Sequence, residues 1–285
     1  MEKICWANTD DFEQSEFVII GIPDESQSHA LRKGTEEAPF KIRQISNLHD
    51  SFERDGKISL GRPFQGSQKK VHDFGNITRS QIESIYDKIT ASSKIPISIG
   101  GDHSITRQII NAITKKYGKI SLVYFDAHPD FVSSMTNYYG SVVNDVLSNI
   151  EIASSVQIGI RTPEQEELDN IKKFNLEVIT TFDIQKKGIK QVANSILNKL
   201  GDKVYISFDM DCIDPAYAPG VSVPVPIGLS STDAVYLLKE IAKKGIVGMD
   251  IMEVCPGFDV KDRTSHLASR IISEVLYSSG ETQLA

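Results

Sequence analysis

Seven apolar runs rich in β-branched residues recur along this chain, and segments with helical spacing separate them. The runs occupy residues 16–22, 95–101, 119–125, 155–160, 176–180, 203–208 and 245–252. Short, continuously apolar runs are typical of strands buried on both faces of a parallel sheet. Helical spacing of apolar residues is found in residues 104–116, 163–174, 189–200, 232–244 and 264–277. The alternation predicts βαβ units, and therefore an α/β fold with a mostly parallel sheet and helices on both sides.

The chain is predicted to form a single domain that spans residues 1–285. Its 285 residues can bury a large core, and no internal repeat, low-complexity tract or long linker divides them. Residues 51–75, which are rich in Gly, Lys and Gln, are predicted to form the largest loop or excursion. Thr264 is a candidate N-cap for the last helix because it directly precedes the helical pattern.

The composition excludes several classes of function. A net charge of −7 argues against a nucleic-acid-binding protein, which would present a basic face. No apolar run reaches the length of a membrane span, and the first residues lack the apolar centre of a signal peptide, so we expect a cytoplasmic protein with no membrane partner. The three cysteines are widely separated and predict neither a disulfide framework nor a zinc knuckle.

Acidic residues and histidines follow three of the predicted strands, in the segments GGDHS, DAHPD and SFDMD. In open α/β sheets, ligands bind beyond the carboxyl ends of the strands, so these side chains are predicted to meet at one rim. A fourth strand end, after residues 245–252, adds Glu253. The candidate metal ligands are His103, Asp126, His128, Asp130, Asp209 and Asp211.

Each of these motifs also has a structural interpretation. Asp102 could cap the helix after GGDHS, the segment SFDMD could form a turn, and Glu253 could be an ordinary ion-pair acid. DAHPD is harder to explain in this way. Alternate positions of an extended chain point Asp126, His128 and Asp130 to the same side, and clustered carboxylates need a positive partner. Neither DAHPD nor SFDMDCID contains Lys or Arg, so a metal site explains them better.

The number and type of these groups favour a particular kind of metal site. Two imidazoles and four carboxylates exceed the usual three protein ligands of a catalytic zinc, which disfavours a single-zinc, deacetylase-like enzyme. Oxygen-rich sites with some imidazole suit manganese or another hard divalent ion, and carboxylates can bridge two ions about 3.5–4 Å apart. The sequence therefore predicts a binuclear site with two Mn²⁺ per chain, which would activate water for a hydrolysis.

Four segments resemble, in order, the signature blocks of the ureohydrolase family, which includes arginase, agmatinase and formiminoglutamase. They are GGDHS, DAHPD, SFDMDCIDPAYAPG and GMDIMEVCP. The resemblance covers most of the chain, from IIGIPDES and a G-x-x-x-x-P-x-x-I-R motif between Gly34 and Arg43 to the end. It implies a three-layer α/β/α fold with a parallel sheet of about eight strands, and a site with two manganese ions.

The resemblance also implies a role for each site residue. The metal ligands would be His103 and Asp130 for one ion, His128 and Asp211 for the other, and Asp126 and Asp209 as bridges between them. Glu253 would hold the guanidinium group of a substrate. Asp130 would also pass a proton to the leaving amine. The implied reaction is the hydrolysis of a guanidino compound to urea and an amine.

The choice of substrate depends on other segments. VPVPIGLS and QIGIRTPEQEE look more like agmatinase than arginase, which indicates agmatine as the substrate and putrescine as the product. The acidity of the chain suits a small cationic guanidino compound. Arg161 is a candidate donor for the carboxylate of arginine or formiminoglutamate, so those substrates stay open.

One position departs from the family pattern. Where relatives place a histidine before a small residue, this chain has Tyr139 before Gly140, and a phenol with a pKa near 10 is a poor proton shuttle at neutral pH. The departure leaves two alternatives: a related amidinohydrolase or formiminoglutamase-type enzyme, and a metal-binding paralogue with weak activity. The resemblance further implies a homo-oligomer, either a trimer or a hexamer.

Other polar residues near the motifs are predicted to have no catalytic role. Cys212 and Cys255 lie beside site residues, but a nucleophilic thiol needs a dedicated base, and the nearby histidines are assigned to metal. Asp214 is predicted to shape its loop as a turn residue. His29 is predicted to be a surface or packing residue.

Overall fold

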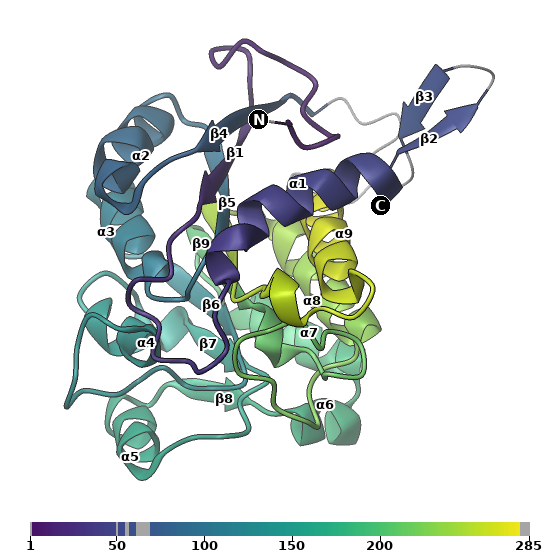
Figure 1. Ribbon diagram of the computed structural model, residues 1–285. Helices are drawn as coiled ribbons and strands as arrows, with labels where there is room; N and C mark the ends of the chain where they lie inside the picture. Colours follow the sequence, from purple (N-terminus) through teal and green to yellow (C-terminus); the bar gives the residue numbers. More distant parts are fainter. Residues whose placement is uncertain (1, 50, 55–56, 61–68, 280–285) are drawn as a thin grey trace.

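The strands form one parallel sheet of eight strands. The computed structural model describes residues 2–49, 51–54, 57–60 and 69–279 (Figure 1). The spatial order is β4-β1-β5-β10-β9-β6-β7-β8, and every neighbouring pair is parallel. The strands are β1 (Phe17–Ile22), β4 (Val71–Asn76), β5 (Ile95–Gly100), β6 (Ser121–Phe125), β7 (Val156–Ile158), β8 (Glu177–Ile179), β9 (Val204–Asp209) and β10 (Gly248–Met252). The predicted α/β fold is therefore confirmed.

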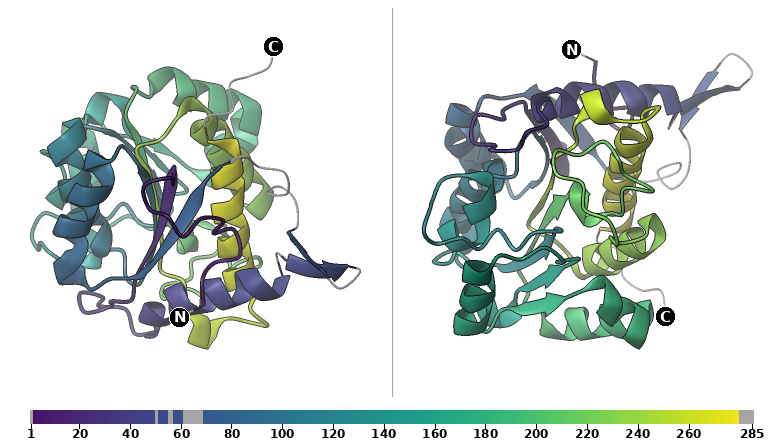
Figure 2. Two further views of the ribbon diagram at one scale, coloured as in Figure 1. Left: turned by 90° about the horizontal axis from the view of Figure 1, so that it is seen from above. Right: turned by 60° about the horizontal axis from the view of Figure 1, so that its bottom comes forward.

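Helices cover both faces of the sheet, which makes three layers (Figure 2). They are α1 (Ala38–His49), α2 (Ile82–Ala91), α3 (Ile105–Tyr117), α4 (Val142–Asp145), α5 (Gln165–Phe174), α6 (Thr181–Lys187), α7 (Ile189–Lys199), α8 (Ser231–Lys244) and α9 (Arg263–Ser278). In β1, Phe17 and Ile19 pack in the core with α1 and α6–α9, whereas Val18 and Ile20 pack in the core with α2–α5. This two-sided burial explains why the strands are continuously apolar.

The segment 51–75 was predicted as a loop or excursion, and this is only partly right. β2 (Ser51–Arg54) and β3 (Lys57–Leu60) form a separate antiparallel pair that projects from the body in Figure 1. Residues 55–56 and 61–68 lie outside the described residues. β4, however, is an edge strand of the main sheet, paired with β1. Its apolar pattern is broken because its buried side chains include a carboxylate, Asp73.

The five predicted helices are all present as α3, α5, α7, α8 and α9, with ends at most two residues from the predicted ones. α1, α2, α4 and α6 were not predicted. Thr264 is not an N-cap, because it lies inside α9 and its Oγ1 accepts a hydrogen bond from the Gly220 amide (2.7 Å). Asp259 provides the acceptors instead, for the amides of Thr264 (2.9 Å) and Ser265 (2.8 Å).

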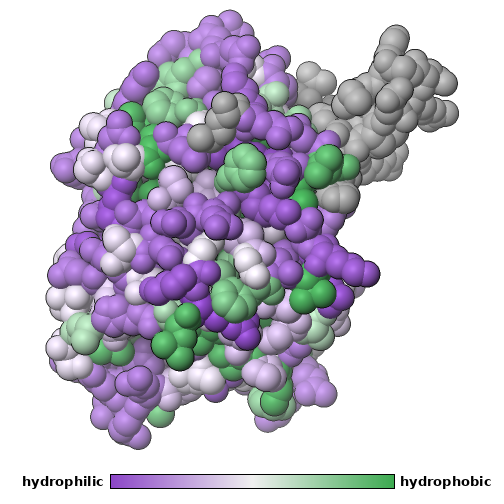
Figure 3. All heavy atoms as spheres, in the orientation of Figure 1, coloured by the Kyte–Doolittle hydropathy of each residue, from purple (hydrophilic) through white to green (hydrophobic). Residues whose placement is uncertain are grey.

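None of the helices in the described part of the chain is long and apolar enough to span a bilayer. The face drawn in Figure 3 is largely hydrophilic, and its hydrophobic residues lie in separate groups.

A buried ion pair fastens the edge strand β4 to α1. Arg43 donates to both oxygens of Asp73 at 2.8 Å, and both side chains are about 1% exposed. The Arg43 guanidinium also donates to the carbonyls of Pro39 and Gly75 and to Asn76 Oδ1. Arg43 is the last residue of the G-x-x-x-x-P-x-x-I-R motif, so this motif has a structural role that the sequence did not reveal.

Asp73→Asn is expected to lower the free energy of unfolding by about 3–5 kcal/mol near neutral pH, because it leaves a buried guanidinium without its counter-charge. Burial by itself would raise the pKa of Asp73, but hydrogen bonds and charge from Arg43 outweigh it and lower the pKa below its usual value. The stabilisation is therefore present above the unfolded-state pKa and is lost as the pH falls through the folded-state pKa. Urea unfolding of both proteins should show a difference that shrinks below about pH 4.

Asp10→Asn is the matched control. Asp10 pairs with Lys3, and this pair lies on the surface. The substitution is expected to leave the unfolding transition unchanged, because exposed ion pairs contribute little. Equal effects of the two substitutions would contradict the role given to the Arg43–Asp73 pair.

Candidate active site

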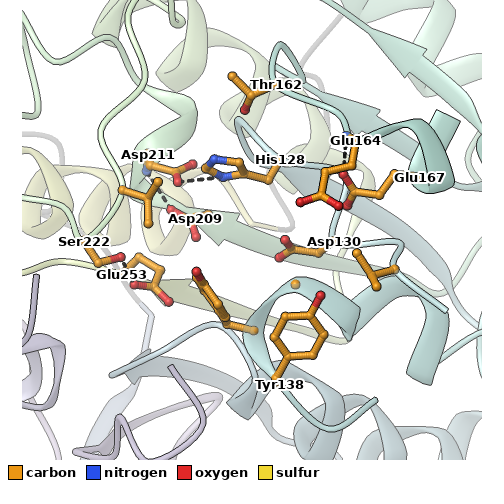
Figure 4. A pocket seen from close by; sticks show the side chains of 14 residues that line it. His128, Asp130, Tyr138, Thr162, Glu164, Glu167, Asp209, Asp211, Ser222 and Glu253 are labelled. Atoms are coloured by element: carbon orange, nitrogen blue, oxygen red, sulfur yellow. Dashed lines mark hydrogen bonds and ion pairs between the residues drawn. The ribbon is translucent and has the colours of Figure 1, made fainter. Parts of the chain in front are cut away.

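Four adjacent strands end at the same rim of the sheet. β5, β10, β9 and β6 are neighbours in the spatial order. His103 follows β5, Glu253 follows β10, Asp209 is the last residue of β9, and Asp126 follows β6. Because the carboxyl ends of parallel strands meet at one edge, these residues, far apart in the sequence, lie at one rim, and Asp209 and Glu253 line a cavity there (Figure 4).

Three carboxylates surround the imidazole of His103. Its Nδ1 lies 3.0 Å from Asp126 Oδ2, 3.1 Å from Asp209 Oδ2 and 3.4 Å from Asp130 Oδ2. All four side chains are buried. Burial lowers the pKa of His103, but the hydrogen bonds to the three carboxylates outweigh it and raise the pKa well above its usual value.

Two carboxylates approach the second imidazole, that of His128. Its Nδ1 lies 3.3 Å from Asp126 Oδ1 and 3.1 Å from Asp211 Oδ2. The His128 side chain is 26% exposed and faces the cavity (Figure 4). Asp126 is thus shared by both imidazoles, one oxygen for each. Five of the six predicted ligands form two groups that could each hold a metal ion, His103 with Asp126 and Asp130, and His128 with Asp126 and Asp211. The sixth, Asp209, lies beside the first group through its contact with His103.

The cluster carries an excess of buried negative charge. In the described part of the chain, none of its four carboxylates pairs with Lys or Arg. Burial and the neighbouring carboxylate of Asp126 raise the pKa of Asp130 to about 7. Asp126 Oδ2 is buried and has no hydrogen-bond partner of suitable geometry. Divalent cations that prefer carboxylate oxygen and imidazole nitrogen fit this set of donors.

Tyr124 is a site residue that the sequence reasoning missed. It is fully buried on β6, and its hydroxyl donates to Asp130 Oδ2 (2.5 Å) and lies 3.1 Å from His103 Nδ1. Its ring stacks on the His103 ring, with centroids 4.8 Å apart and planes at 2°. The signal was present in the sequence, because Tyr124 precedes Asp126 by two residues and so continues the alternation of DAHPD one step back into the strand.

Glu253 enters the cavity from the loop after β10. Its backbone has a φ of +64°, and Asp130 has a φ of +47°. Positive φ is uncommon for such residues and clusters at functional sites. Glu253 Oε1 accepts from the His103 amide (2.8 Å), and Oε2 accepts from the Ser222 hydroxyl. Burial raises the pKa of Glu253 to about 8. Among the described residues it has no ion-pair partner, which argues against the ordinary ion-pair interpretation.

Tyr139 is one of the residues that line the cavity. The cavity is lined by His128, Asp130, Val132, Tyr138, Tyr139, Gly140, Thr162, Glu164, Glu167, Asp209, Asp211, Ser222, Val223 and Glu253 (Figure 4). Burial and the charge of Glu253 raise the pKa of Tyr139, so that its hydroxyl remains a neutral donor. His29 is exposed, and its ring centroid lies 5.2 Å from that of Tyr138 and 6.1 Å from that of Tyr139.

Arg161 does not lie where a substrate-binding residue was predicted. It is not among the lining residues, and its guanidinium donates to backbone carbonyls. These belong to Gly159, Asp211, Cys212, Val225 and Pro226, at distances from 2.6 to 3.3 Å. Arg161 thereby joins the loop after β7 to the segment between β9 and α8, and this position lends no support to the prediction that it binds substrate. Sequence alone could not separate these roles, because both require a strand-end arginine.

Two acids from the start of α5 were also missed. Glu167 Oε1 accepts from the Phe131 amide (3.0 Å) and Oε2 accepts from the Glu164 amide (2.8 Å), so this carboxylate joins the DAHPD loop to α5. Glu164 lines the cavity beside it (Figure 4). The run of acids in RTPEQEE was the available signal, but it resembles an ordinary acidic first turn of a helix.

The properties of Cys212, Cys255 and Asp214 fit structural roles and not catalytic ones. Burial raises the pKa of Cys212 well above its usual value and that of Cys255 to about 12, so neither is a thiolate near neutral pH. Asp214 accepts from the amides of Ala216 (2.9 Å) and Gly228 (3.0 Å), which confirms its predicted place in a turn.

Known proteins are similar to this chain in sequence and in structure along most of its length. A family model described as Arginase family matches residues 15–277. The agmatinase of Neisseria meningitidis serogroup C is 35% identical over 282 residues, covering 93% of this chain and 88% of that protein. The agmatinase of Cronobacter sakazakii is 34% identical over 280 residues, covering 92% and 87%. The solved structure of the agmatine ureohydrolase of Thermoplasma volcanium matches with a TM-score of 0.84 at 32% identity, covering 98% of this chain and 94% of that one. The chain therefore belongs to the arginase family.

Proposed function

We propose that this enzyme is a binuclear manganese hydrolase that cleaves agmatine to urea and putrescine. The observation that carries the proposal is the buried cluster of two imidazoles and four carboxylates, which has no Lys or Arg partner among the described residues and shares its cavity with Glu253. Such a cluster needs cations to be stable when fully ionised. The relatives named agmatinase support the choice of reaction.

The two groups of ligands suggest how the ions are held. We assign His103 and Asp130 to one Mn²⁺, His128 and Asp211 to the other, and Asp126 and Asp209 to both. The position of Asp126 supports its bridging role, because each of its oxygens lies next to a different imidazole. When bound, the two ions would lower the pKa of a water molecule and so supply a nucleophile near neutral pH.

Glu253 is suited to hold the guanidinium group. The His103 amide and the Ser222 hydroxyl fix its two oxygens, so the carboxylate is oriented before a substrate arrives. An ionised carboxylate can accept two parallel hydrogen bonds from a guanidinium, which fixes the orientation of the planar group as well as its charge. A reacting group held in one orientation needs less loss of entropy to reach the transition state.

Asp130 is suited to move the proton that the reaction requires. Hydrolysis adds the oxygen of water to the guanidinium carbon, breaks the bond from that carbon to the substituted nitrogen, and delivers a proton to this nitrogen. The Asp130 carboxyl lines the cavity, so it can reach a reacting group there and carry a proton to the leaving nitrogen. The hydroxyl of Tyr124 holds Asp130 Oδ2 from the strand side.

The lining of the cavity favours a substrate with a second positive charge. Within the described residues it contains no Lys or Arg, and Arg161 is fully engaged with backbone carbonyls. A carboxylate tail, as in arginine, would lack a cationic partner there. Glu164 and Glu167 both line the cavity, so their carboxylates are the candidates to attract the distal ammonium of agmatine.

Two alternative functions also rest on specific features of the chain. Another guanidino or formimino compound would use the same metal centre, because the cluster does not depend on the tail of the substrate. A metal-binding paralogue with weak activity would keep the ligands and alter the groups around the substrate, as Tyr139 does. Homo-oligomerisation and a cytoplasmic location also stay predictions.

Urea release tests the proposal. Metal-depleted protein reloaded with Mn²⁺ is assayed in parallel on agmatine, arginine, guanidinobutyrate and guanidinopropionate, and agmatine is expected to give the highest kcat/KM. Equal or higher activity on arginine or guanidinobutyrate would contradict the role of the acidic cavity wall. Absence of urea from all four compounds would overturn the amidinohydrolase proposal, and a formimino substrate would be assayed next.

Tyr139→Phe is expected to lower kcat/KM by about tenfold at most, because it removes one neutral hydrogen-bond donor worth about 0.5–1.5 kcal/mol. The raised pKa of Tyr139 keeps its proton on the ring oxygen, so the loss should be the same from pH 7 to pH 9. Steady-state kinetics over this range provide the measurement. A loss that changes with pH would instead show that the phenol transfers protons.

A further inference from the structure

Asp250 is a fully buried carboxylate on β10 that does not line the cavity. It has no Lys or Arg partner among the residues that the structure describes. Its Oδ1 accepts from Ser207 Oγ (2.9 Å) and from the Phe208 amide (3.3 Å). Its Oδ2 accepts from Tyr205 Oη (2.7 Å) and Thr106 Oγ1 (2.9 Å). A buried charge held only by neutral donors is costly, so its position calls for an explanation.

One side of Asp250 leads directly to the metal cluster. Ser207, on β9, donates to Asp250 Oδ1, and its Oγ lies 2.9 Å from Nε2 of His103. The opposite nitrogen of the same ring, Nδ1, faces the oxygens of Asp126 and Asp209. Asp250, Ser207 and His103 therefore form one chain of hydrogen bonds that ends at the cluster.

We propose that Asp250 is a positioning residue, which acts through Ser207 to fix the tautomer and the orientation of the His103 ring for metal binding. The inference rests on the proposed function, because it assigns His103 to a Mn²⁺ ion. Asp250 can only accept when ionised, so the Ser207 hydroxyl donates to it and offers its lone pair to His103. Nε2 then carries the ring proton, and Nδ1 presents its lone pair to the ion.

Two neighbours, Tyr124 and Ser207, orient the His103 ring. The parallel ring of Tyr124, at 4.8 Å, limits tilting of the imidazole out of its plane. Stacking cannot distinguish the two ways in which the ring can be flipped within that plane. Contacts of the two ring nitrogens supply this distinction, because only one flip places Nε2 against Ser207 Oγ (2.9 Å) and Nδ1 against the Tyr124 hydroxyl (3.1 Å).

A purely structural role is the competing explanation. Asp250 also joins β10 to β9 through Tyr205 and to α3 through Thr106. These bonds involve Oδ2, whereas the chain to His103 begins at Oδ1. The two oxygens therefore offer a matched comparison: Ser207→Ala interrupts the chain to His103, and Tyr205→Phe removes a donor from the same carboxylate on the other side.

The test is calorimetric titration of metal-depleted full-length protein with Mn²⁺. Ser207→Ala is expected to weaken binding of one ion by about 10–100-fold, the effect usual for residues that orient a metal ligand. Ser207→Thr, which keeps the hydroxyl, is expected to restore the affinity. Tyr205→Phe is expected to bind Mn²⁺ as the unchanged protein does, although it lowers the unfolding temperature. In kinetics, Ser207→Ala is expected to lower kcat at subsaturating Mn²⁺ and to leave KM unchanged.

The outcomes separate this inference from the proposed function. If Ser207→Ala and Tyr205→Phe lower the unfolding temperature alike and neither alters Mn²⁺ affinity, Asp250 is structural and the inference fails. If Ser207→Ala does not fold, Asp250→Asn takes its place, and unchanged Mn²⁺ affinity in that variant overturns the inference equally. If the unsubstituted protein binds no Mn²⁺, the metal centre itself is wrong and the proposed function fails first.

Discussion

Asp126→Ala is expected to reduce the Mn²⁺ content from two ions per chain to one at most, and to lower urea release by about a thousandfold or more. Asp126 is the carboxylate that both imidazoles approach, with Oδ2 3.0 Å from His103 Nδ1 and Oδ1 3.3 Å from His128 Nδ1. Its loss should therefore weaken both ion sites. Metal ions supply several kcal/mol of transition-state stabilisation, and each 1.36 kcal/mol corresponds to about tenfold in rate. Elemental analysis of the purified variant, together with the urea assay, provides the measurement.

Asp214→Ala is the matched control for this experiment. Asp214 lies in the same segment as Asp209 and Asp211, but its oxygens accept from the amides of Ala216 and Gly228. It should keep both ions, and added Mn²⁺ should raise its unfolding temperature as it does for the unsubstituted protein. Asp126→Ala should lack this shift. Two ions retained in Asp126→Ala would show that the shared-ligand assignment is wrong.

Glu253→Gln is expected to lower kcat/KM for agmatine by about 10²–10³-fold while the Mn²⁺ content stays the same. The amide keeps the size of the side chain and can still accept from the His103 amide, but it has no charge to oppose that of a guanidinium. Because Glu253 lies outside the cluster of six candidate ligands, the substitution should change kcat/KM without changing the Mn²⁺ content. Unchanged kinetics, or a loss of metal that parallels the loss of rate, would contradict the substrate-binding role.

The pH dependence of kcat/KM in the unsubstituted enzyme should follow the ionisation of Glu253. Burial raises the pKa of Glu253 to about 8, so the side chain is mostly protonated below this pH and ionised above it. Only the ionised form attracts a guanidinium, and kcat/KM should therefore rise as the pH increases through about 8. Glu253→Gln should lack this rise. Ser222→Ala should move the rise to higher pH, because it removes a hydrogen bond that stabilises the ionised form.

Most of the sheet could be predicted because its central strands are buried on both sides. In β1, for example, alternate residues pack into the cores on opposite faces, so the sequence shows an unbroken apolar run. β4 could not be found in this way. One of its inward-facing residues is Asp73, whose charge is neutralised by Arg43 from a helix some thirty residues earlier in the chain. A local pattern does not contain such a distant partner.

The cluster of carboxylates and imidazoles could be predicted because its members lie at the ends of strands. The segments GGDHS, DAHPD and SFDMD each follow or end a strand, and the carboxyl ends of parallel strands share one rim. Strict alternation does not continue through DAHPD, because the chain bends after Asp126 and Asp130 has a positive φ. The contacts of Arg161 could not be predicted, because a position at a strand end is compatible with either a substrate or the five carbonyls that it contacts in the structure. Tyr124 was missed because an aromatic residue inside a buried strand is usually part of the core.

The sequence by itself determined the fold class, the family and the six side chains that meet at the rim. These depend on periodicity, strand-end position and residue order, all of which can be read from the linear sequence. Only the tertiary structure decided which groups contact one another across strands. It placed Tyr124 on the ring of His103, Ser207 and Asp250 behind it, and Arg161 away from the cavity. Hydrogen bonds act over about 3 Å, so such contacts depend on the packing of several elements and cannot be derived from the sequence of any one of them.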